Sequence, residues 1–372
     1  MNKEKRKIKL VIVINDFLVG GAQRLIIELL RYLDRSRFDV VLVTLMQFEG
    51  KETMYHLLPK DIQIRKLNFR GFADIKSWTT LWKLLRKERP DVVLSHLFFS
   101  NTVARILNIF TKYKTITVEH NTYEGNKKWQ VWSDHILSRF SQKIVAVSTQ
   151  VMEFAYKQQR ISREKFVVIK NGIDVEAVAE KASSTNALEV RGELGVEPAT
   201  KLIIMVGRLT GQKEPILLID GFAGFAHSHS NYHLAILGDG ALRIDMEKRV
   251  KDLDIGNQVH FLGNVSDIHR YYGVAEFLVS TSRIEGLSMA HLEALSCGVP
   301  ILATHTAGSE ELIEEGKNGL FISNRTPQAI EDGFVRMIER DMLALHQGAR
   351  ETAKNYDIWN TVSQYEKLIS SV

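Results

Sequence analysis

Short apolar runs, each followed by a glycine or a small polar residue, recur along the whole sequence. In the first half, runs at Lys9–Ile14 and Asp39–Thr44 alternate with segments whose apolar residues have helical spacing, Gln23–Leu33 and Ile75–Arg89. Further apolar runs of this kind are Asp91–Leu94, Thr115–Val118 and Ile144–Val147. Alternating buried strands and helices are typical of a parallel sheet with helices on both faces. The sequence therefore predicts a doubly wound α/β fold.

The second half repeats this pattern. Its five apolar runs are Lys201–Val206, His233–Leu237, Val259–Leu262, Glu276–Val279 and Pro300–Ala303. Since ligands of open parallel sheets bind at the carboxyl ends of the strands, two such sheets predict two Rossmann-like domains facing a cleft. We expect a first domain over residues 1–172, a second over 173–356 that begins with a loosely patterned connection (176–200), and a terminal helix over 357–372.

Charge separates the two halves of the 372-residue chain. Residues 1–172 hold 31 Lys and Arg against 16 Asp and Glu, a net charge of +15, whereas residues 173–372 hold 18 against 28, a net charge of −10. A break of this size favours two domains with different partners.

The remaining composition indicates a cytoplasmic protein. The single cysteine, Cys297, fits a reducing compartment and is expected to be a small buried apolar residue. The apolar run Leu10–Ile14 after the basic N-terminus is too short for a signal peptide, and no stretch of 18 apolar residues occurs that would span a membrane.

Several residues at predicted strand ends are suited to binding a phosphorylated sugar. Backbone N–H groups at Gly20 and Gly21 precede a helix and can face an anion, although a plain turn explains them equally. Arg208 and Lys213 can neutralise a diphosphate, or be solvated surface charges. Glu285 and Glu293 are carboxylates that can accept hydrogen bonds from sugar hydroxyls. His120 follows a predicted strand, and this histidine is either functional or structural.

Patterns that would indicate other cofactors are weak. Gly20-Gly21 and Gly238-Asp239-Gly240 both lack the glycine spacing of a dinucleotide site. The histidines have no metal-site spacing, and Asp252-Leu253-Asp254 ends a predicted helix, where a solvated surface is the simpler explanation. We expect neither a metal nor a cofactor.

Five motifs in order resemble glycosyltransferase family 4, the retaining enzymes with two Rossmann-like domains known as the B-type fold. The strongest stretch is Arg283–Gly319, which contains two glutamates eight residues apart, and the other four are Gly20–Arg24, Val168–Asp174, Val206–Leu209 and Phe261–Gly263. The sequence departs from the family's usual residues at Gln23, at Ser288 and at Thr306-Ala307-Gly308.

The resemblance implies roles for individual residues. Arg208 and Lys213 would hold the donor diphosphate, Glu293 the ribose hydroxyls and Glu285 hydroxyls of the donor sugar. His120 would lie beside that sugar, and the last helix would return to the first domain. Backbone groups that would contact phosphate, sugar or base are those of Gly20, Gly21, Gly263, Val265, Gly286, Leu287 and Ser288.

The implied activity is metal-independent transfer of a hexosyl or N-acetylhexosaminyl group from a nucleotide-diphosphate sugar, with retention at the anomeric carbon. The acceptor would be a lipid-linked saccharide in polysaccharide or glycolipid synthesis. A nucleotide-sugar epimerase and a sugar-binding module without turnover remain the alternatives.

The basic first half suggests that the protein is peripheral on the inner face of the cell membrane. On a helix over Ile75–Arg89 an apolar stripe would lie beside basic residues, the composition of an interfacial helix. The same stripe would also suit packing against a sheet. The residues expected to contact an anionic membrane or the acceptor are Trp78, Trp82, Lys83, Lys87, Lys127, Lys128 and Trp129. No nucleic-acid partner is expected, because the aromatic residues match no nucleic-acid motif.

Overall fold

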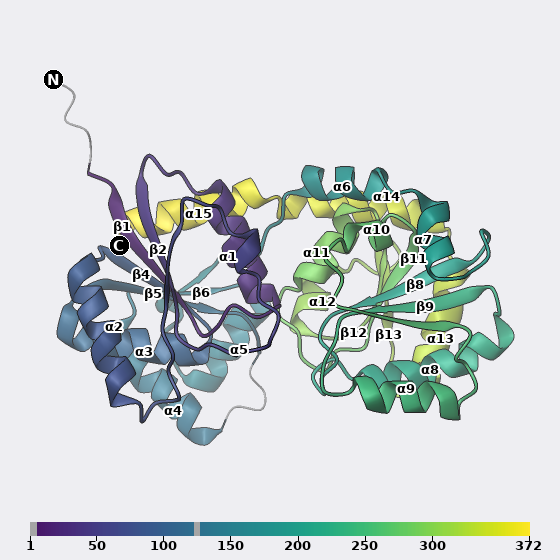
Figure 1. Cartoon of the computed structure of the whole chain (residues 1–372), viewed down its shortest axis with the longest axis horizontal. Coiled ribbons are helices and arrows are strands. Elements are labelled where there is room, and N and C mark those ends of the chain that lie inside the picture. Colours follow the sequence, from purple (N-terminus) through teal and green to yellow (C-terminus); the bar gives the residue numbers. More distant parts are fainter. Residues whose placement is uncertain (1–5, 123–126) are drawn as a thin grey trace. The chain divides into compact units, whose positions relative to one another are not determined.

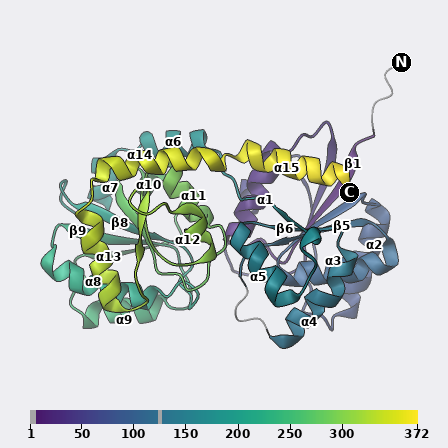
Figure 2. The same cartoon turned by 180° about the vertical axis from the view of Figure 1, so that it is seen from behind.

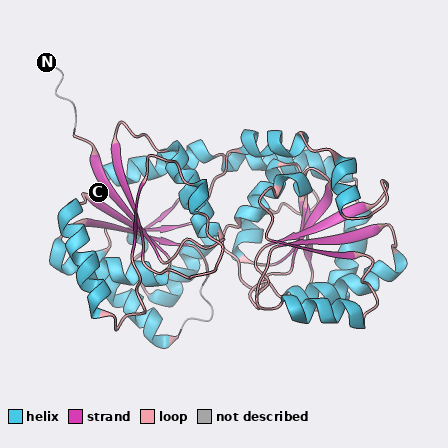
Figure 3. Ribbon diagram, viewed as in Figure 1, coloured by secondary structure: helices cyan, strands magenta, loops and turns pink. Residues whose placement is uncertain are grey.

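The chain forms two compact units, each built on a parallel sheet. One unit comprises the residues up to Gly172 together with Ile358–Val372, and the other comprises Ile173–Asp357. The computed structural model describes residues 6–122 and 127–372 (Figure 1). Within each unit the strands lie between helices (Figure 3). The prediction of two Rossmann-like α/β domains is confirmed.

The first unit has a seven-stranded sheet in the order β3-β2-β1-β4-β5-β6-β7. Its strands are β1 (Ile8–Ile14), β2 (Phe38–Thr44), β3 (Gln63–Lys66), β4 (Val92–His96), β5 (Lys114–Glu119), β6 (Lys143–Ala146) and β7 (Phe166–Val168). The sequence did not predict β3 and β7. Both are short edge strands. Three of the four residues of β3 are exposed, so β3 has no apolar run, whereas β7 is apolar throughout and was not recognised as a strand.

Six α-helices belong to this unit: α1 (Gly21–Tyr32), α2 (Ile75–Glu88), α3 (Phe98–Thr111), α4 (Lys128–Leu137), α5 (Thr149–Gln159) and α15 (Ile358–Ser371). The C-terminal helix α15 lies beside α1 in both views of the chain (Figures 1 and 2). The ring of Trp359 packs edge-on against Tyr32, with centroids 4.9 Å apart. Glu366 pairs with Arg37 at 2.8 Å and accepts a bond from the backbone N–H of Asp34.

The second unit has a six-stranded sheet in the order β10-β9-β8-β11-β12-β13. Its strands are β8 (Lys201–Val206), β9 (Tyr232–Leu237), β10 (Val259–Gly263), β11 (Ala275–Ser280), β12 (Ile301–Thr304) and β13 (Gly319–Ile322). Its helices are α6 (Val175–Ser183), α7 (Ala187–Glu193), α8 (Pro215–Ser228), α9 (Arg243–Asp252), α10 (His269–Tyr272), α11 (Met289–Ser296), α12 (Ala307–Leu312), α13 (Pro327–Ile338) and α14 (Met342–Ala353).

The segment 176–200 is more ordered than a connection. It contains most of α6 and all of α7, and α6 contacts α10 and α11 of the second unit. Only Val178, Ala182 and Val190 are buried within the two helices, so their apolar faces are too narrow to form a clear periodic pattern.

A buried charge network connects α3, α4 and β5 in the first unit. Arg105, which is fully buried, donates to Asp134 at 2.7 Å and to the hydroxyl groups of Thr117 and Ser141 at 2.9 Å. Glu119 lies 4.0 Å from the same guanidinium group. Burial, reinforced by the nearby charge of Asp134, raises the pKa of Glu119 to about 7.

This raised pKa predicts that the first unit loses stability as the pH rises from about 4.5 to about 7. In that window the unfolded chain releases the Glu119 proton while the folded chain keeps it, so ionisation favours unfolding. The substitution Glu119→Gln removes the titration. At pH 8 we expect the variant to unfold with a free energy about 1–3 kcal/mol higher than that of the wild type.

Urea unfolding followed by tryptophan fluorescence measures this effect, because all five tryptophans lie in the first unit. The exposed Glu49 supplies the control Glu49→Gln, which should leave the pH dependence unchanged. Identical pH dependence in the wild type and Glu119→Gln would contradict the prediction.

Candidate active site

Two loops at the carboxyl ends of β8 and β11 join into one structure in the second unit. The ammonium group of Lys213 pairs with the carboxylate of Glu285, which also accepts a bond from the Ser282 hydroxyl at 3.3 Å. The side-chain amide of Gln212 donates to the carbonyl of Ile284 at 2.8 Å. The predicted residues Lys213 and Glu285 are therefore held in contact by the loops that carry them.

Arg208 follows β8 at the same edge of the sheet. Its side chain is exposed and forms no ion pair within the described ranges. The neighbouring backbone is tightly packed, because a Cβ at Gly238 would lie 2.0 Å from the carbonyl oxygen of Gly207. Leu209 donates its N–H to the carbonyl of Asp239 at 3.0 Å. This rigid turn leaves the guanidinium group available to an anion.

Glu293 is buried in α11, with 6% of its surface exposed. Its carboxylate accepts a hydrogen bond from the hydroxyl group of Tyr272 at 3.2 Å. Glu293 is the fifth residue of α11, so it lies about one turn into the helix. Ser288 is the N-cap of the helix, and the preceding Gly286 and Leu287 are buried.

The loop that carries Glu285 rests on Gly308. A Cβ at Gly308 would lie 1.5 Å from the carbonyl oxygen of Gly286, and the N–H of Gly308 donates to the carbonyl of Glu285 at 3.0 Å. Only glycine permits this approach, so Gly308 fixes the position of the loop.

Gly263 and Val265 lie at the end of β10. Gly263 has a φ of +67°, and its carbonyl accepts the N–H of Gly238 at 2.7 Å. Because β10, β9, β8 and β11 are neighbours in the sheet, the predicted donor residues of this unit all follow strands at one edge.

His291 belongs to the same region, and the sequence did not reveal it. The side chain is buried, and its Nδ1 has no hydrogen-bond partner among the described residues. Burial lowers the pKa of His291 to about 4. The charge of Glu285 has a smaller effect that raises this pKa, and the charge of Lys213 a smaller effect that lowers it. A lone histidine within a helix has no spacing that would indicate a site.

The predicted residues of the first unit occupy the carboxyl ends of β1 and β5. Gly20 precedes α1, and a Cβ there would lie 2.6 Å from the amide oxygen of Gln23. Gln23 donates to the carboxylate of Asp16 at 3.1 Å, so its side chain closes the turn at Gly20 and Gly21. His120 follows β5 directly. Its Nε2 lies 2.9 Å from Nδ1 of His96, a buried residue that the sequence did not single out.

The apolar stripe of α2 packs on the sheet, which is the second of the two arrangements that its spacing allowed. Trp78 and Trp82 are half-buried and pack on the same core as Leu81 and Leu85. The indole N–H of Trp78 donates to the carbonyl of Phe72 at 2.9 Å. A helix that covers a sheet needs the same spacing of apolar residues as a helix that lies on lipid. The basic residues Lys83 and Lys87 remain exposed.

A different aromatic surface is exposed at α4. Trp129 and Trp132 are 50% and 67% exposed, and Phe72 is 38% exposed. The ring of Trp129 contacts Phe72 and Phe98 with centroids 6.3 and 5.7 Å apart. We call Phe72, Trp129 and Trp132 the aromatic ledge. The exposed basic residues on the same segments are Arg70, Lys76, Lys127 and Lys128.

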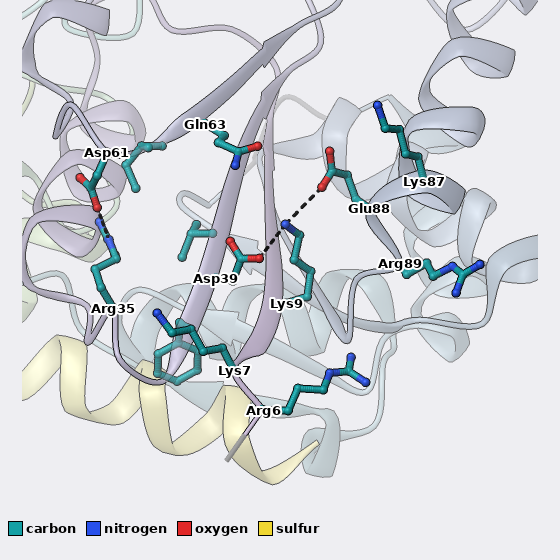
Figure 4. Close-up of a pocket in the computed structure, with 13 residues that line it drawn as sticks. Arg6, Lys7, Lys9, Arg35, Asp39, Asp61, Gln63, Lys87, Glu88 and Arg89 are labelled. Atoms are coloured by element: carbon teal, nitrogen blue, oxygen red, sulfur yellow. Dashed lines mark hydrogen bonds and ion pairs between the residues drawn. The ribbon is translucent and has the colours of Figure 1, made fainter. Parts of the chain in front are cut away.

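A cavity of about 860 Å³ lies elsewhere, at the amino ends of the strands in the first unit (Figure 4). Its central Lys9 is paired with Asp39 at 2.9 Å and with Glu88 at 3.2 Å. Figure 4 shows the side chains of Lys87 and Arg89 pointing away from that of Lys7. These cations do not converge on one point, so the cavity has no arrangement that would hold a single anion.

Residues 6–122 and 127–372 contain no cluster typical of a metal site and no helix suited to crossing a membrane. No three His, Cys, Asp or Glu side chains gather there as a metal site would require. The Asp252-Leu253-Asp254 sequence lies where α9 ends. No helix in these ranges has the length and apolar character needed to cross a bilayer.

Comparisons with known families match both units. Residues 19–177 match the model described as Glycosyltransferase Family 4, and residues 187–356 match the model described as Glycosyl transferases group 1. The chain belongs to glycosyltransferase family 4. As the motifs at its strand ends predicted, this family 4 protein is a glycosyltransferase.

Relatives of this glycosyltransferase cover almost its whole length. It is 25% identical to UDP-Gal:alpha-D-GlcNAc-diphosphoundecaprenol alpha-1,3-galactosyltransferase of Escherichia coli, over 92% of this chain and 91% of the relative. It is 27% identical to a Campylobacter jejuni N-acetylgalactosaminyltransferase, over 94% and 96%. The full name of that enzyme is N-acetylgalactosamine-N,N'-diacetylbacillosaminyl-diphospho-undecaprenol 4-alpha-N-acetylgalactosaminyltransferase. These relatives do not favour an epimerase or a module without turnover.

Solved structures support the B-type fold. The crystal structure of Anabaena Alr3699/HepE in complex with UDP and glucose has a TM-score of 0.84 and 20% identity, covering 98% of this chain and all of the other. The lipopolysaccharide outer core galactosyltransferase WaaB has a TM-score of 0.72 and 19% identity, covering 98% and 99%.

The contact between Gly308 and Gly286 predicts that Gly308→Ala impairs transfer. The added Cβ must displace the loop that carries Glu285, because it would meet backbone and no flexible side chain. We expect a loss of roughly 10²-fold in kcat/KM, as for misplacement of a positioned group. Thermal melting by circular dichroism reports the accompanying loss of stability.

Gly256→Ala is the matched control, because nothing lies within 4 Å of a Cβ at Gly256. It should leave transfer unchanged. Equal transfer by the two variants would show that the loop does not depend on Gly308.

Proposed function

We propose that this glycosyltransferase moves a hexosyl or N-acetylhexosaminyl group from a nucleotide-diphosphate sugar to a lipid-linked saccharide, with retention at the anomeric carbon and without a metal. The observation that carries the proposal is the cluster at the strand ends of the second unit. Arg208, which is exposed, and Lys213 follow β8, and Lys213 pairs with Glu285, which follows β11. Glu293 is buried in α11, the helix after β11. These are groups that a diphosphate, a sugar and a ribose need.

Arg208 and Lys213 would stabilise the leaving diphosphate. Negative charge develops on that group as its bond to the sugar breaks, and cations fixed beforehand lower the energy of this transition state. Arg208 offers a planar pair of donors, and Lys213 offers a point charge already held near the loop by Glu285. Gly286, Leu287 and Ser288, just before α11, would add backbone N–H donors.

Glu285 and Glu293 would orient the donor through its hydroxyl groups. Each carboxylate accepts hydrogen bonds and donates none, so each suits a pair of hydroxyls. Glu293 would take the ribose, supported by the Tyr272 hydroxyl that already donates to it. Glu285 would take the transferred sugar, and His120 is proposed to contact that sugar. In a retaining transfer the leaving phosphate would accept the proton of the attacking hydroxyl.

The acceptor side is proposed from the first unit and from the relatives. Both enzymes named above carry diphospho-undecaprenol saccharides in their names. The aromatic ledge offers indole and phenyl rings, which favour the membrane interface, and each basic residue near an anionic leaflet contributes about 1 kcal/mol. We therefore propose that the ledge, with Lys127 and Lys128, docks the protein on the inner face of the cell membrane.

Substitution of either Arg208 or Glu293, two of the proposed donor-binding residues, should reduce transfer. We expect Arg208→Ala and Glu293→Gln each to lower kcat/KM by roughly 10²-fold, because each loses one contact to the reacting donor. The measurement is release of nucleoside diphosphate from UDP-, GDP- and ADP-sugars in the presence of lipid-linked acceptor. EDTA in the same assay tests whether transfer proceeds without a metal.

Arg340→Ala provides a matched control, since Arg340 is an exposed arginine of the same unit. Its transfer rate should equal that of the wild type. Wild-type rates in Arg208→Ala and Glu293→Gln would refute the proposed donor site.

The proposed docking surface predicts binding to anionic vesicles. Wild-type protein should co-sediment with phosphatidylglycerol-containing liposomes and not with pure phosphatidylcholine, and salt should weaken the binding. We expect the quadruple change Lys127→Glu, Lys128→Glu, Trp129→Ala and Trp132→Ala to reduce binding at least tenfold, about 1.4 kcal/mol.

A charge-matched control separates this surface from overall charge. Lys248 and Lys251 are exposed lysines of the second unit, and reversing both should leave liposome binding unchanged. Equal losses in the two variants would mean that net charge alone drives binding, and equal binding to both vesicle types would exclude membrane docking.

A further inference from the structure

Two histidines meet at the ends of neighbouring strands in the first unit. His96 is the last residue of β4, and His120 directly follows β5, with which β4 pairs. Nδ1 of His96 lies 2.9 Å from Nε2 of His120, and the ring centroids are 5.2 Å apart. His96 is completely buried, whereas His120 keeps part of its surface exposed.

Both rings are neutral near pH 7. Burial, followed by the proximity of His120, lowers the pKa of His96 well below 6.5, and burial lowers the pKa of His120 to about 4. Two neutral imidazoles at this distance share one hydrogen bond, so one ring donates and the other accepts. The direction of that bond decides which nitrogen of His120 carries its proton.

The environment of His96 favours one direction. Its Nε2 is buried and has no hydrogen-bond partner in the part of the chain that the structure describes. If His120 were the donor, His96 would carry its own proton on Nε2, leaving a buried N–H without an acceptor. If His96 is the donor, Nε2 keeps only a lone pair. Buried N–H groups without partners are rarer than acceptors without partners.

The backbone beside His96 also has a strained conformation. Leu97 has φ = 73° and ψ = 154°, a region occupied almost solely by glycine, and it joins His96 to the first residue of α3. Such strain persists where surrounding contacts over-determine a position, and it concentrates at functional sites. This turn fixes where the His96 ring lies relative to His120.

We propose that His96 is a positioning residue that donates its Nδ1–H to Nε2 of His120, and so fixes the tautomer in which His120 presents Nδ1–H to an oxygen of the transferred sugar. The inference rests on the proposed place of His120 beside that sugar. His96 itself is buried and touches no substrate. It acts by making His120 a hydrogen-bond donor at the nitrogen left for the substrate.

Three substitutions of His96 test whether the direction of the hydrogen bond, and not the shape of the side chain, determines the tautomer of His120. The amide nitrogen of asparagine can occupy the place of Nδ1 and donate, so His96→Asn should preserve the bond. Leucine fills the space without a hydrogen bond, so His96→Leu should leave His120 free to adopt either tautomer. Ionised aspartate can only accept, so His96→Asp should move the His120 proton to Nε2 and raise its pKa.

Nitrogen NMR of histidine-labelled protein without substrate measures the tautomer, with the His120 signals assigned from His120→Asn. We expect Nδ1–H in the wild type and in His96→Asn, a mixture in His96→Leu, and Nε2–H or the charged form in His96→Asp. An Nε2–H tautomer of His120 in the wild type would overturn the proposal. So would an unchanged single tautomer in His96→Leu.

Kinetics provide the second readout. We expect kcat in His96→Asn within about threefold of the wild type, and about tenfold or more lower in His96→Leu, as for a histidine in the wrong tautomer. The KM for the donor should change less than kcat. Equal rates in His96→Asn and His96→Leu would overturn the positioning role. These two variants are a sufficient test if His96→Asp does not fold.

The two readouts distinguish the inference from the proposed function. If NMR shows the expected tautomers but His120→Asn transfers sugar at the wild-type rate, the role proposed for His120 fails and the hydrogen bond from His96 stands. If His120→Asn loses transfer but the wild-type tautomer is Nε2–H, the role of His120 stands and the inference about His96 fails.

Discussion

The parallel direction of the strands is the constraint on which the rest of each unit depends. Every loop that follows a strand emerges at one edge of the sheet, so residues distant in sequence become neighbours without long excursions of the chain. In the second unit this edge is crowded, and the carbonyl groups of Gly207 and Gly286 lie where side chains at Gly238 and Gly308 would stand. Glycine at positions 238 and 308 is thus required by packing, and Gly308 also supports the loop that carries Glu285.

Much of the fold follows from the sequence, because central parallel strands are buried on both faces and appear as apolar runs. The fully buried residues of β1 from Leu10 to Ile14 are an example. Elements with little buried surface leave no such trace. The edge strand β3 exposes three of its four residues, and α6 and α7 together bury only three side chains. Their place is set by contacts with the rest of the unit, which no local pattern encodes.

The candidate site divides in the same way. Arg208, Lys213 and Glu285 are candidates that the sequence offers because they lie near strand ends marked by glycine or serine, and Glu293 follows one turn into α11. His96 and His291 have no such signal in the sequence, since only folding brings His96 against His120 and exposes His291 to the charges of Glu285 and Lys213. The stripe of α2 was ambiguous for a physical reason, because an apolar face of given spacing fits a sheet as well as a membrane.

Net charge and local charge have separate consequences here. The second unit is proposed to bind a diphosphate although it lies in the half of the chain with a net charge of −10. At physiological salt, exposed charges more than about 8 Å apart are largely screened, so distant carboxylates have little effect on a diphosphate beside Arg208 and the Lys213–Glu285 pair. The charge of +15 in the first half would act differently in the proposed membrane docking, because a membrane is an extended anion that many exposed cations can contact together. In the proposed function, a unit of net negative charge would hold the anionic donor through nearby cations, while the net charge of the basic unit would act at the lipid surface.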